Sequence, residues 1–311
     1  MEVLYVAGAI LFLLLVYFIV VFVVYKNSFT NSDKTDELVL DNKDELQPFK
    51  NEINLSYQEF DSFEKEDIYI KSFDNLKLYG RFIKNIKSNK VAISFHGFNC
   101  RARKEYPLHF SFFKEGYSLL IVDQRGMGLS EGKYLCMAMN ERKDCLKWIE
   151  YVLNRFNNDV EIVIEGVSMG ASTVMLAAQD IKYPQVKGII ADCGFNSAYD
   201  QIKHNLSTLM KLPSFPLLNT VRLYNKLFAK YEMKETTAID SLSKSDIPIL
   251  IIHGRSDNFV PYENINIIYD KIKTNNKMRL DVDGAGHAAS YVVKKDLYTQ
   301  TVKKFLKSIN F

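Results

Sequence analysis

The chain contains few of the features that would assign it quickly to a functional class. Its four cysteines show neither a C-x-x-C pair nor the spacing of a metal site, so we interpret them as free, buried thiols. Free thiols agree with a reducing compartment without excluding the outside of the cell. The net charge is only +3 at pH 7, and no dense stripe of lysine and arginine occurs. This balance argues against nucleic acid as a partner.

Charged residues are also absent from one long stretch, residues 3–25, which consists mostly of Leu, Ile, Val, Phe and Tyr. At 1.5 Å per residue a helix of this length spans about 34 Å, enough for the hydrocarbon core of a bilayer. A cleaved signal peptide is the rival interpretation. It would need a basic start, a shorter apolar stretch and a small-residue cleavage site, and none of these is present. We therefore predict a transmembrane anchor over residues 1–26, with lipid contact through residues 3–25.

The lysines around this run predict its orientation. Lys26, Lys34 and Lys43 follow the run, whereas no lysine or arginine precedes it. Positive residues flank membrane helices on the cytoplasmic side, so this rule places the rest of the chain in the cytoplasm. The sequence therefore predicts a single-pass membrane protein with a large cytoplasmic domain.

The remaining chain divides into a polar connection and a globular domain. Residues 27–66 are rich in Asn, Asp, Lys and Glu, and we expect a linker that becomes an ordered edge near residues 57–63. Residues 67–311 begin with two alternating runs, 67–73 and 77–83, that predict an antiparallel hairpin. Strands are then expected at 91–95, 119–122, 162–164, 186–191, 247–253 and 278–282, and the clearest helix at 140–156. This alternation predicts an α/β domain with a mainly parallel sheet and helices on both faces.

One interval breaks the alternation. Residues 194–246 separate two of the expected strands and contain helical patterns interrupted by Pro213 and Pro216. Such a long insertion at the carboxyl edge of a parallel sheet is typical of a lid or cap. Its apolar side chains either wall a substrate pocket or only pack the cap onto the domain; they are Phe195, Tyr199, Met210, Phe215, Tyr224 and Phe228.

The most informative motif is Gly-Val-Ser-Met-Gly at residues 166–170. An apolar run at 161–165 precedes it and a helical pattern at 171–178 follows it. This is the G-x-S-x-G pattern, in which a serine occupies a tight turn between a strand and a helix. Glycines are needed two positions before and after the serine, because side chains at these positions would clash in the turn. The N-terminus of the following helix favours negative charge near the serine. The pattern predicts Ser168 as a nucleophile; the alternative is a glycine-rich turn without chemistry.

A histidine is the second expected part of the site, because a serine hydroxyl is a weak nucleophile until a base takes its proton. In this kind of sheet protein the chain order is serine, carboxylate, histidine. His287 lies in a glycine-flanked loop after an expected strand, so we predict it as the base. His204 is expected at the solvated surface of the cap, and His253 is expected to pack or hydrogen-bond locally.

The acid is expected in the loop after the strand at 247–253. Asp257 lies there, far enough before His287 to leave room for one helix and one strand. Its rival is Asp192, at the end of the preceding strand, and the alternative role for Asp257 is to cap the next helix. The backbone N–H groups of an oxyanion hole are predicted at Met169, directly after the nucleophile, and at Phe98, in the loop after the strand at 91–95.

Five motifs together resemble the α/β-hydrolase superfamily, from residue 65 to the end of the chain. They are His-Gly-Phe at 96–98, Asp-Gln-Arg-Gly-Met-Gly-Leu-Ser at 123–130, Gly-Val-Ser-Met-Gly at 166–170, His-Gly-Arg-Ser-Asp at 253–257 with Val-Pro at 260–261, and Gly-His at 286–287. The resemblance is closest to membrane-anchored, esterase-like or peptidase-like bacterial members. It implies an α/β-hydrolase fold with a small helical cap, an intact triad and a structural role for Arg125. The chain departs from lipases with a His-Gly-Gly-Gly loop, which argues against bulky tertiary esters as substrates.

These motifs predict a serine hydrolase that cleaves carboxylic esters or thioesters through an acyl-enzyme. Its substrate would be a small-molecule acyl ester or a short peptide, and neither a metal nor an organic cofactor is needed for this chemistry. A serine peptidase or amidase of the same fold is the first alternative, and it would need a polar or acidic subsite for a peptide terminus. A catalytically silent, membrane-tethered binding scaffold is the second, against which the complete Ser-Asp-His set argues.

Overall fold

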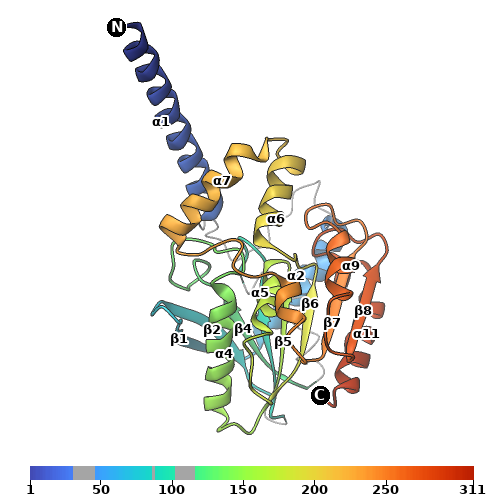
Figure 1. Ribbon diagram of the computed structural model, residues 1–311. Helices are drawn as coiled ribbons and strands as arrows, with labels where there is room; N and C mark the ends of the chain where they lie inside the picture. Colours follow the sequence, from blue (N-terminus) through green and yellow to red (C-terminus); the bar gives the residue numbers. More distant parts are fainter. Residues whose placement is uncertain (31–45, 86–87, 102–115) are drawn as a thin grey trace.

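An eight-stranded sheet forms the centre of the protein in a computed structural model that describes residues 1–30, 46–85, 88–101 and 116–311 (Figure 1). The strands are β1 (Glu66–Lys71), β2 (Lys77–Ile83), β3 (Lys90–Phe95), β4 (Ser118–Asp123), β5 (Glu161–Val167), β6 (Val186–Asp192), β7 (Ile249–Gly254) and β8 (Lys277–Val282). Their order across the sheet is β1-β2-β4-β3-β5-β6-β7-β8. β2 runs antiparallel to both β1 and β4, and the pairs from β4 to β8 are parallel.

The predicted fold class is confirmed by this sheet. The predicted hairpin is the β1–β2 pair, and every other expected strand overlaps an observed one. All residues of β4 and β7 are buried, because helices cover the sheet on both faces. Continuous burial explains why these strands appear in the sequence as unbroken apolar runs instead of alternating patterns.

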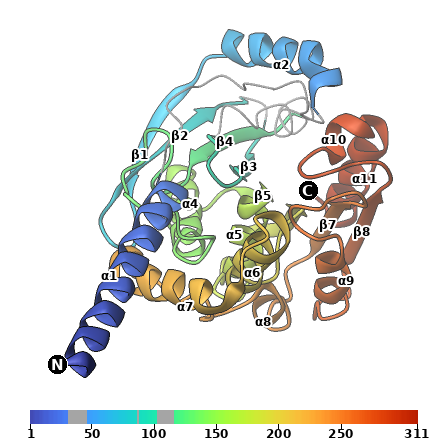
Figure 2. The same cartoon turned by 90° about the horizontal axis from the view of Figure 1, so that it is seen from above.

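Helices pack against both faces of the sheet, as Figure 2 shows from above. The helices of the domain body are η1 (Gln47–Phe49), α2 (Lys50–Ser62), α4 (Glu141–Arg155), α5 (Met169–Ala177), α9 (Glu263–Tyr269), α10 (Ser290–Val293) and α11 (Lys295–Ser308). On one face, α4 and α5 bury Trp148 and Val174 in the larger core. On the other face, α2 and α11 bury Phe60 and Phe305 in a second core.

Helix α2 corrects the expectation that residues 27–66 become ordered only near residues 57–63. Residues 31–45 of this segment lie outside the described residues, but residues 50–62 form a helix instead of a linker. Ile53 and Phe60 are its only buried residues, and Phe60 is fully buried. Tyr57, which packs against the second core, lies between them. Ile53, Tyr57 and Phe60 therefore have the i, i+4, i+7 spacing of a helix face, which the interpretation as a linker missed.

The insertion at 194–246 connects β6 to β7 and folds as helices. They are α6 (Ala198–His204), η3 (Asn205–Leu209), α7 (Ser214–Tyr224), η4 (Asn225–Ala229) and α8 (Ala238–Leu242). Figure 1 shows α6 and α7 standing together over one end of the sheet. We call residues 194–246 the cap.

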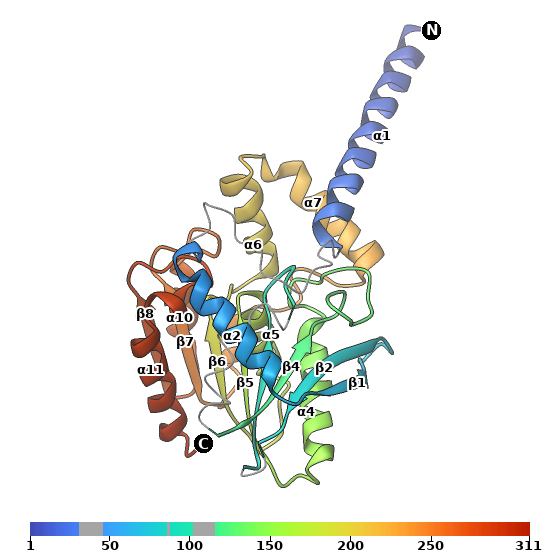
Figure 3. The same ribbon diagram turned by 180° about the vertical axis from the view of Figure 1, so that it is seen from behind.

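The N-terminal helix α1 (Glu2–Phe29) has two different halves. Its first half projects away from the domain, as Figures 1 and 3 show from opposite sides. Its second half packs on α7, with Val21, Tyr25 and Phe29 buried. The helix is long and apolar enough to cross a membrane, a property that a signal sequence shares.

Candidate active site

Ser168 lies on the turn between β5 and α5. Its backbone angles, φ 56° and ψ −117°, are in a region that residues other than glycine rarely adopt. A β-carbon on Gly166 would lie 2.3 Å from the carbonyl carbon of Gly170, and one on Gly170 would lie 1.9 Å from the carbonyl oxygen of Phe95. Gly166 is therefore needed for β5 to approach the start of α5, and Gly170 for the turn to pack on β3. The turn presents Ser168 to a pocket above the sheet.

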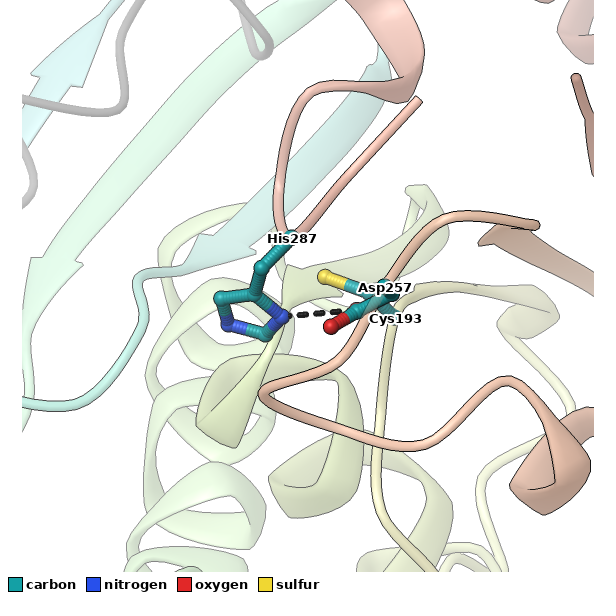
Figure 4. A group of neighbouring side chains, drawn as sticks. All are labelled: Cys193, Asp257 and His287. Atoms are coloured by element: carbon teal, nitrogen blue, oxygen red, sulfur yellow. Dashed lines mark hydrogen bonds and ion pairs between the residues drawn. The ribbon is translucent and has the colours of Figure 1, made fainter. Parts of the chain in front are cut away.

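His287, in the loop after β8, connects the serine to the carboxylate. Its Nε2 atom lies 2.9 Å from Ser168 Oγ, and its Nδ1 atom lies 2.8 Å from Asp257 Oδ2. Figure 4 shows the second of these hydrogen bonds. Because an ionised carboxylate only accepts hydrogen bonds, we assign the imidazole proton to Nδ1, which leaves Nε2 to accept the Ser168 hydroxyl proton. The structure thus brings the three residues into one chain of hydrogen bonds.

The Asp257 carboxylate is buried and surrounded by donors. Its Oδ1 atom accepts hydrogen bonds from the backbone N–H groups of Phe259 and Val260, both at 2.9 Å. His253 Nε2 lies 3.3 Å from Oδ2. Burial raises the pKa of this carboxyl, but hydrogen bonds from His253 and His287 outweigh the burial and lower the pKa to about 2. Asp257 is therefore ionised at neutral pH.

The other candidates from the sequence lie beside this chain of hydrogen bonds. The carboxylate of Asp192 accepts from Ser290 Oγ at 3.2 Å, and burial raises its pKa to about 6. His253 is buried and hydrogen-bonds to the acid loop, as expected of a locally bonded residue. His204 lies partly exposed on the cap, and its Nε2 atom lies 3.0 Å from the Asn258 carbonyl oxygen in an exposed hydrogen bond.

The two backbone amides predicted for an oxyanion hole belong to the residue after the serine and to a residue that lines the same pocket. Met169 is the first residue of α5, so its N–H group has no carbonyl partner within the helix. Phe98 lies in the loop after β3 and lines the same pocket as Ser168. Both amides are candidates to bind an oxyanion formed on a substrate carbonyl.

A buried network that the sequence reasoning did not select holds the loop after β3. The Gln124 N–H group donates to His96 Nε2 at 3.0 Å, and the Gln124 side-chain amide donates to the His96 carbonyl. Thr173 Oγ1 donates to Gln124 Oε1 at 2.9 Å, which joins this loop to α5. His96 and Gln124 could have been selected from the sequence by their positions in the motifs at 96–98 and 123–130. No motif in the sequence indicates Thr173.

Arg125 has the structural role that the resemblance implied. Its buried guanidinium bonds to both oxygens of Asp144 on α4, at 2.6 and 2.8 Å. It also bonds to both oxygens of Asp74 in the β1–β2 turn, at 3.0 and 2.9 Å. It thus joins the loop after β4 to two other elements and does not line the pocket at Ser168.

Ser168 opens into an apolar pocket of about 390 Å³, a size typical of small-molecule sites. The described residues that line it are Val20, Val21, Val24, Tyr25, Ser28, Phe29, Phe98, Met137, Ser168, Phe195, Gln201, Ile202, Asn205, Leu206, Met210, Leu212, Leu217, Val221, Phe259 and Val260. None of these residues is charged. The first six belong to α1, which sequence reasoning had treated only as an anchor.

The aromatic and aliphatic residues expected in the cap divide between the two roles left open. Phe195 and Met210 line the pocket. Tyr224 and Phe228 pack their rings against Phe22 of α1, with centroids 5.6 and 5.1 Å away. Tyr199 also packs against the larger core, with the Lys234 ammonium over its ring. Phe215 has neither role, because it is 77% exposed.

Cys193 lies close enough to Asp257 and His287 for the three to be considered as a metal site (Figure 4). The donor set does not favour a cation. Burial raises the pKa of the Cys193 thiol well above its usual value, whereas metals bind the thiolate. Asp257 and His287 also already share a hydrogen bond. Their geometry is that of a pair that positions an imidazole.

The fold and the site define a hydrolase of the α/β type, and comparison with known proteins agrees. A family model described as serine aminopeptidase, S33, matches residues 86–245, about half of the chain. A second model, described as alpha/beta hydrolase domain containing 18, matches residues 219–308. The chain belongs to the first of these families and, with it, to the α/β-hydrolase superfamily.

The chain is also similar in sequence to curated relatives and in fold to solved structures. The uncharacterized protein YqkD of Bacillus subtilis (strain 168) is 28% identical over 82% of this chain and 83% of its own length. The Pyrococcus furiosus esterase Pf2001 is 26% identical, with a TM-score of 0.65 over 79% of this chain and 91% of that protein. An acylaminoacyl peptidase of Pyrococcus horikoshii is 20% identical, with a TM-score of 0.59 over 81% of this chain and 42% of that protein, and shares the fold.

Proposed function

We propose that this protein is a membrane-anchored serine hydrolase that cleaves carboxylic esters or thioesters. The observation that carries the proposal is the continuous hydrogen-bonded chain from Ser168 through His287 to Asp257, at the base of an apolar pocket. A serine, an imidazole and an ionised carboxylate in this order are the parts that acyl transfer requires.

The proposed reaction starts with Ser168 Oγ attacking the substrate carbonyl carbon while His287 Nε2 takes the hydroxyl proton. Asp257 holds the imidazole in the required tautomer and stabilises its positive charge. The N–H groups of Met169 and Phe98 bind the oxyanion of the tetrahedral intermediate. His287 then donates its proton to the leaving alcohol or thiol, and an acyl-enzyme forms. Water, deprotonated by His287, attacks the acyl-enzyme and releases the acid.

The pocket lining favours an ester or thioester over a peptide. An aminopeptidase needs a negative group near the substrate's ammonium, because an unpaired buried charge is strongly unfavourable. None of the described residues that line the pocket is charged, and an acyl chain matches the lining better. The serine peptidase or amidase is nevertheless the second candidate, because the matching family model carries an aminopeptidase description.

The test is to label the full-length protein with a fluorophosphonate probe, wild type against Ser168→Ala, and then to compare p-nitrophenyl esters with aminoacyl p-nitroanilides. We expect labelling that disappears in the variant, and hydrolysis of esters in preference to anilides. A preference for anilides would replace the esterase proposal by the peptidase. A folded wild type that neither reacts with the probe nor hydrolyses any of these substrates would favour the silent scaffold instead.

The membrane anchor is part of the proposal, with α1 retained in the mature protein. Removal of α1 as a signal sequence would take Val21, Tyr25 and Phe29 out of the hydrophobic core and expose their partners on the cap. The positive-inside rule gives a cytoplasmic domain, on the basis of Lys26 and of two lysines outside the described residues. Protease protection in intact cells tests this orientation, since an externally accessible domain would contradict it.

A further inference from the structure

The second half of α1 contacts the cap through hydrogen bonds as well as apolar packing. Tyr25 Oη donates to Asn225 Oδ1 at 3.0 Å, and Tyr224 Oη donates to the Phe18 carbonyl at 2.8 Å. The hydroxyls of Tyr17 and Thr220 also lie 2.9 Å apart. These contacts begin near the middle of the helix, so α1 and the cap form one packed unit.

This packed unit places α1 at the edge of the pocket. Val21 is buried in the pocket wall, whereas Val20 and Val24 line the pocket while being 55% and 49% exposed. A residue that lines a pocket and is still half exposed lies at its rim. On the cap side, Met210 and Leu212 line the pocket and are also exposed. The pocket therefore has an apolar rim between α1 and the cap.

The length of α1 places this rim at a membrane surface. A helix needs about 20 apolar residues to cross the hydrocarbon core, which from Val3 reaches Phe22. The residues from Tyr17 to Phe22 already contact α7. When α1 spans the bilayer, α7 must consequently lie at or within the interface on that side.

The exposed surface of the cap fits this position. Its large apolar residues with more than a third of their surface exposed are Leu209, Met210, Leu212, Phe215, Leu223, Leu227 and Phe228. Figures 1 and 3 show the turn between α6 and α7 pointing toward the same side as the free half of α1. Such a group of apolar side chains next to a membrane helix suits the boundary between headgroups and acyl chains.

We propose that the substrate is an acyl ester that resides in the bilayer, and that its acyl chain enters the pocket between α1 and the cap. α1 is then a specificity-determining wall of the site as well as an anchor. This inference rests on the proposed function, and its covalent steps are those already described, with water as the only other reactant.

The first test measures chain-length preference. The full-length protein is reconstituted in phosphatidylcholine vesicles, and kcat/KM is measured for p-nitrophenyl esters from acetate to palmitate. Val24→Trp places a large side chain at the rim of the pocket. The matched control is Val23→Trp, because Val23 is 52% exposed on the same helix and does not line the pocket. We expect the ratio of palmitate to acetate hydrolysis to fall about tenfold or more in Val24→Trp, as hydrophobic pockets discriminate by such factors, and to stay at the wild-type value in Val23→Trp.

The second test measures contact of the cap with the bilayer. Phe215→Trp should have tryptophan fluorescence that is quenched by lipids brominated on their acyl chains. Leu297→Trp is the control, because Leu297 is a large exposed residue on α11, far in the chain from the cap. Quenching equal in the two variants, or an unchanged chain-length ratio in Val24→Trp, would overturn the inference.

Failure of the proposed function has a different signature. The wild type would then neither bind the fluorophosphonate at Ser168 nor hydrolyse any ester, the acetate included, and both proposals would fall together. A protein that hydrolyses acetate well, prefers short chains and shows no quenching at position 215 would leave the esterase in place and remove only the bilayer substrate.

Discussion

The base and the wall of the pocket are built in different ways. The base consists of Ser168, Asp257 and His287, each in a loop that directly follows a strand of one sheet. The wall consists of α1 and the cap, whose contacting residues are separated by about two hundred positions, as in the Tyr25–Asn225 hydrogen bond. The base is therefore positioned by the sheet, whereas the wall depends on two helical segments remaining docked.

Because of this difference, the proposed chemistry depends on the base of the pocket, whereas the choice of substrate depends on its wall. Residues at the ends of parallel strands in one sheet stay aligned because the sheet holds their backbones, so the positions of these three side chains tolerate changes elsewhere. Side chains in α1 and the cap can change the size and opening of the pocket without moving the serine. If the proposed mechanism holds, the same base can thus serve different substrates.

The largest effect is expected from breaking the base at Asp257. Asp257→Asn keeps the shape of the side chain but favours the wrong imidazole tautomer, and the corresponding change in serine proteases lowers kcat by about 10⁴-fold. We expect a loss of that order for p-nitrophenyl butyrate, with the fold intact by circular dichroism. The control is Asp283→Asn, an aspartate in the next loop whose side chain is 84% exposed. A variant at 257 within tenfold of wild type would refute the assigned role of this carboxylate.

The second prediction concerns the turn that carries the serine. Gly170→Ala puts a β-carbon 1.9 Å from the Phe95 carbonyl oxygen, a backbone atom that cannot move without displacing β3. We expect the free energy of unfolding to fall by about 3 kcal/mol or more, measured by chemical denaturation in detergent. Gly8→Ala is the control, since its β-carbon would meet nothing within 4 Å. Equal stability of the two variants would show that the turn relaxes more easily than its contacts indicate.

The strands and the turn that carries Ser168 could be predicted from the sequence, whereas the wall of the pocket could not. Strands buried on both faces and glycines forced by a tight turn leave local patterns, so the strands and the position of Ser168 were recognisable. The confirmed fold also explains why Asp257 and His287 could be selected by their place after strands; their catalytic roles stay predictions. No local pattern showed that Val24 faces a pocket, because this depends on how α1 docks on a cap far along the chain.

A third, smaller effect is expected from the buried carboxylate that is not part of the base. Burial raises the pKa of Asp192 to about 6 in the folded protein, from an ordinary value of 3.8. Between these values the folded state binds a proton that the unfolded state has lost, so stability from this group is present below pH 4 and is lost as pH rises through 6. The free energy of unfolding of Asp192→Asn, relative to that of wild type, should therefore rise by about 2 kcal/mol between pH 4 and pH 8. The measurement is chemical denaturation of both proteins at pH 4 and pH 8. A difference in their free energies of unfolding that is the same at both pH values would contradict this prediction.

The smallest effect is expected at the junction of α1 and the cap, where the wall is held. Tyr25→Phe removes the hydrogen bond to Asn225 Oδ1 and leaves that buried amide without its donor, which corresponds to about 1 kcal/mol. Global stability should change little more than this, because Phe keeps the ring contacts with Phe29 and Tyr224. Hydrogen exchange in the α7 and η4 segments should nevertheless rise, while exchange in β5 and α5 stays at the wild-type rate. If the two regions responded equally, the wall and the base would be one cooperative unit, and pocket selectivity could not vary independently of the reacting groups.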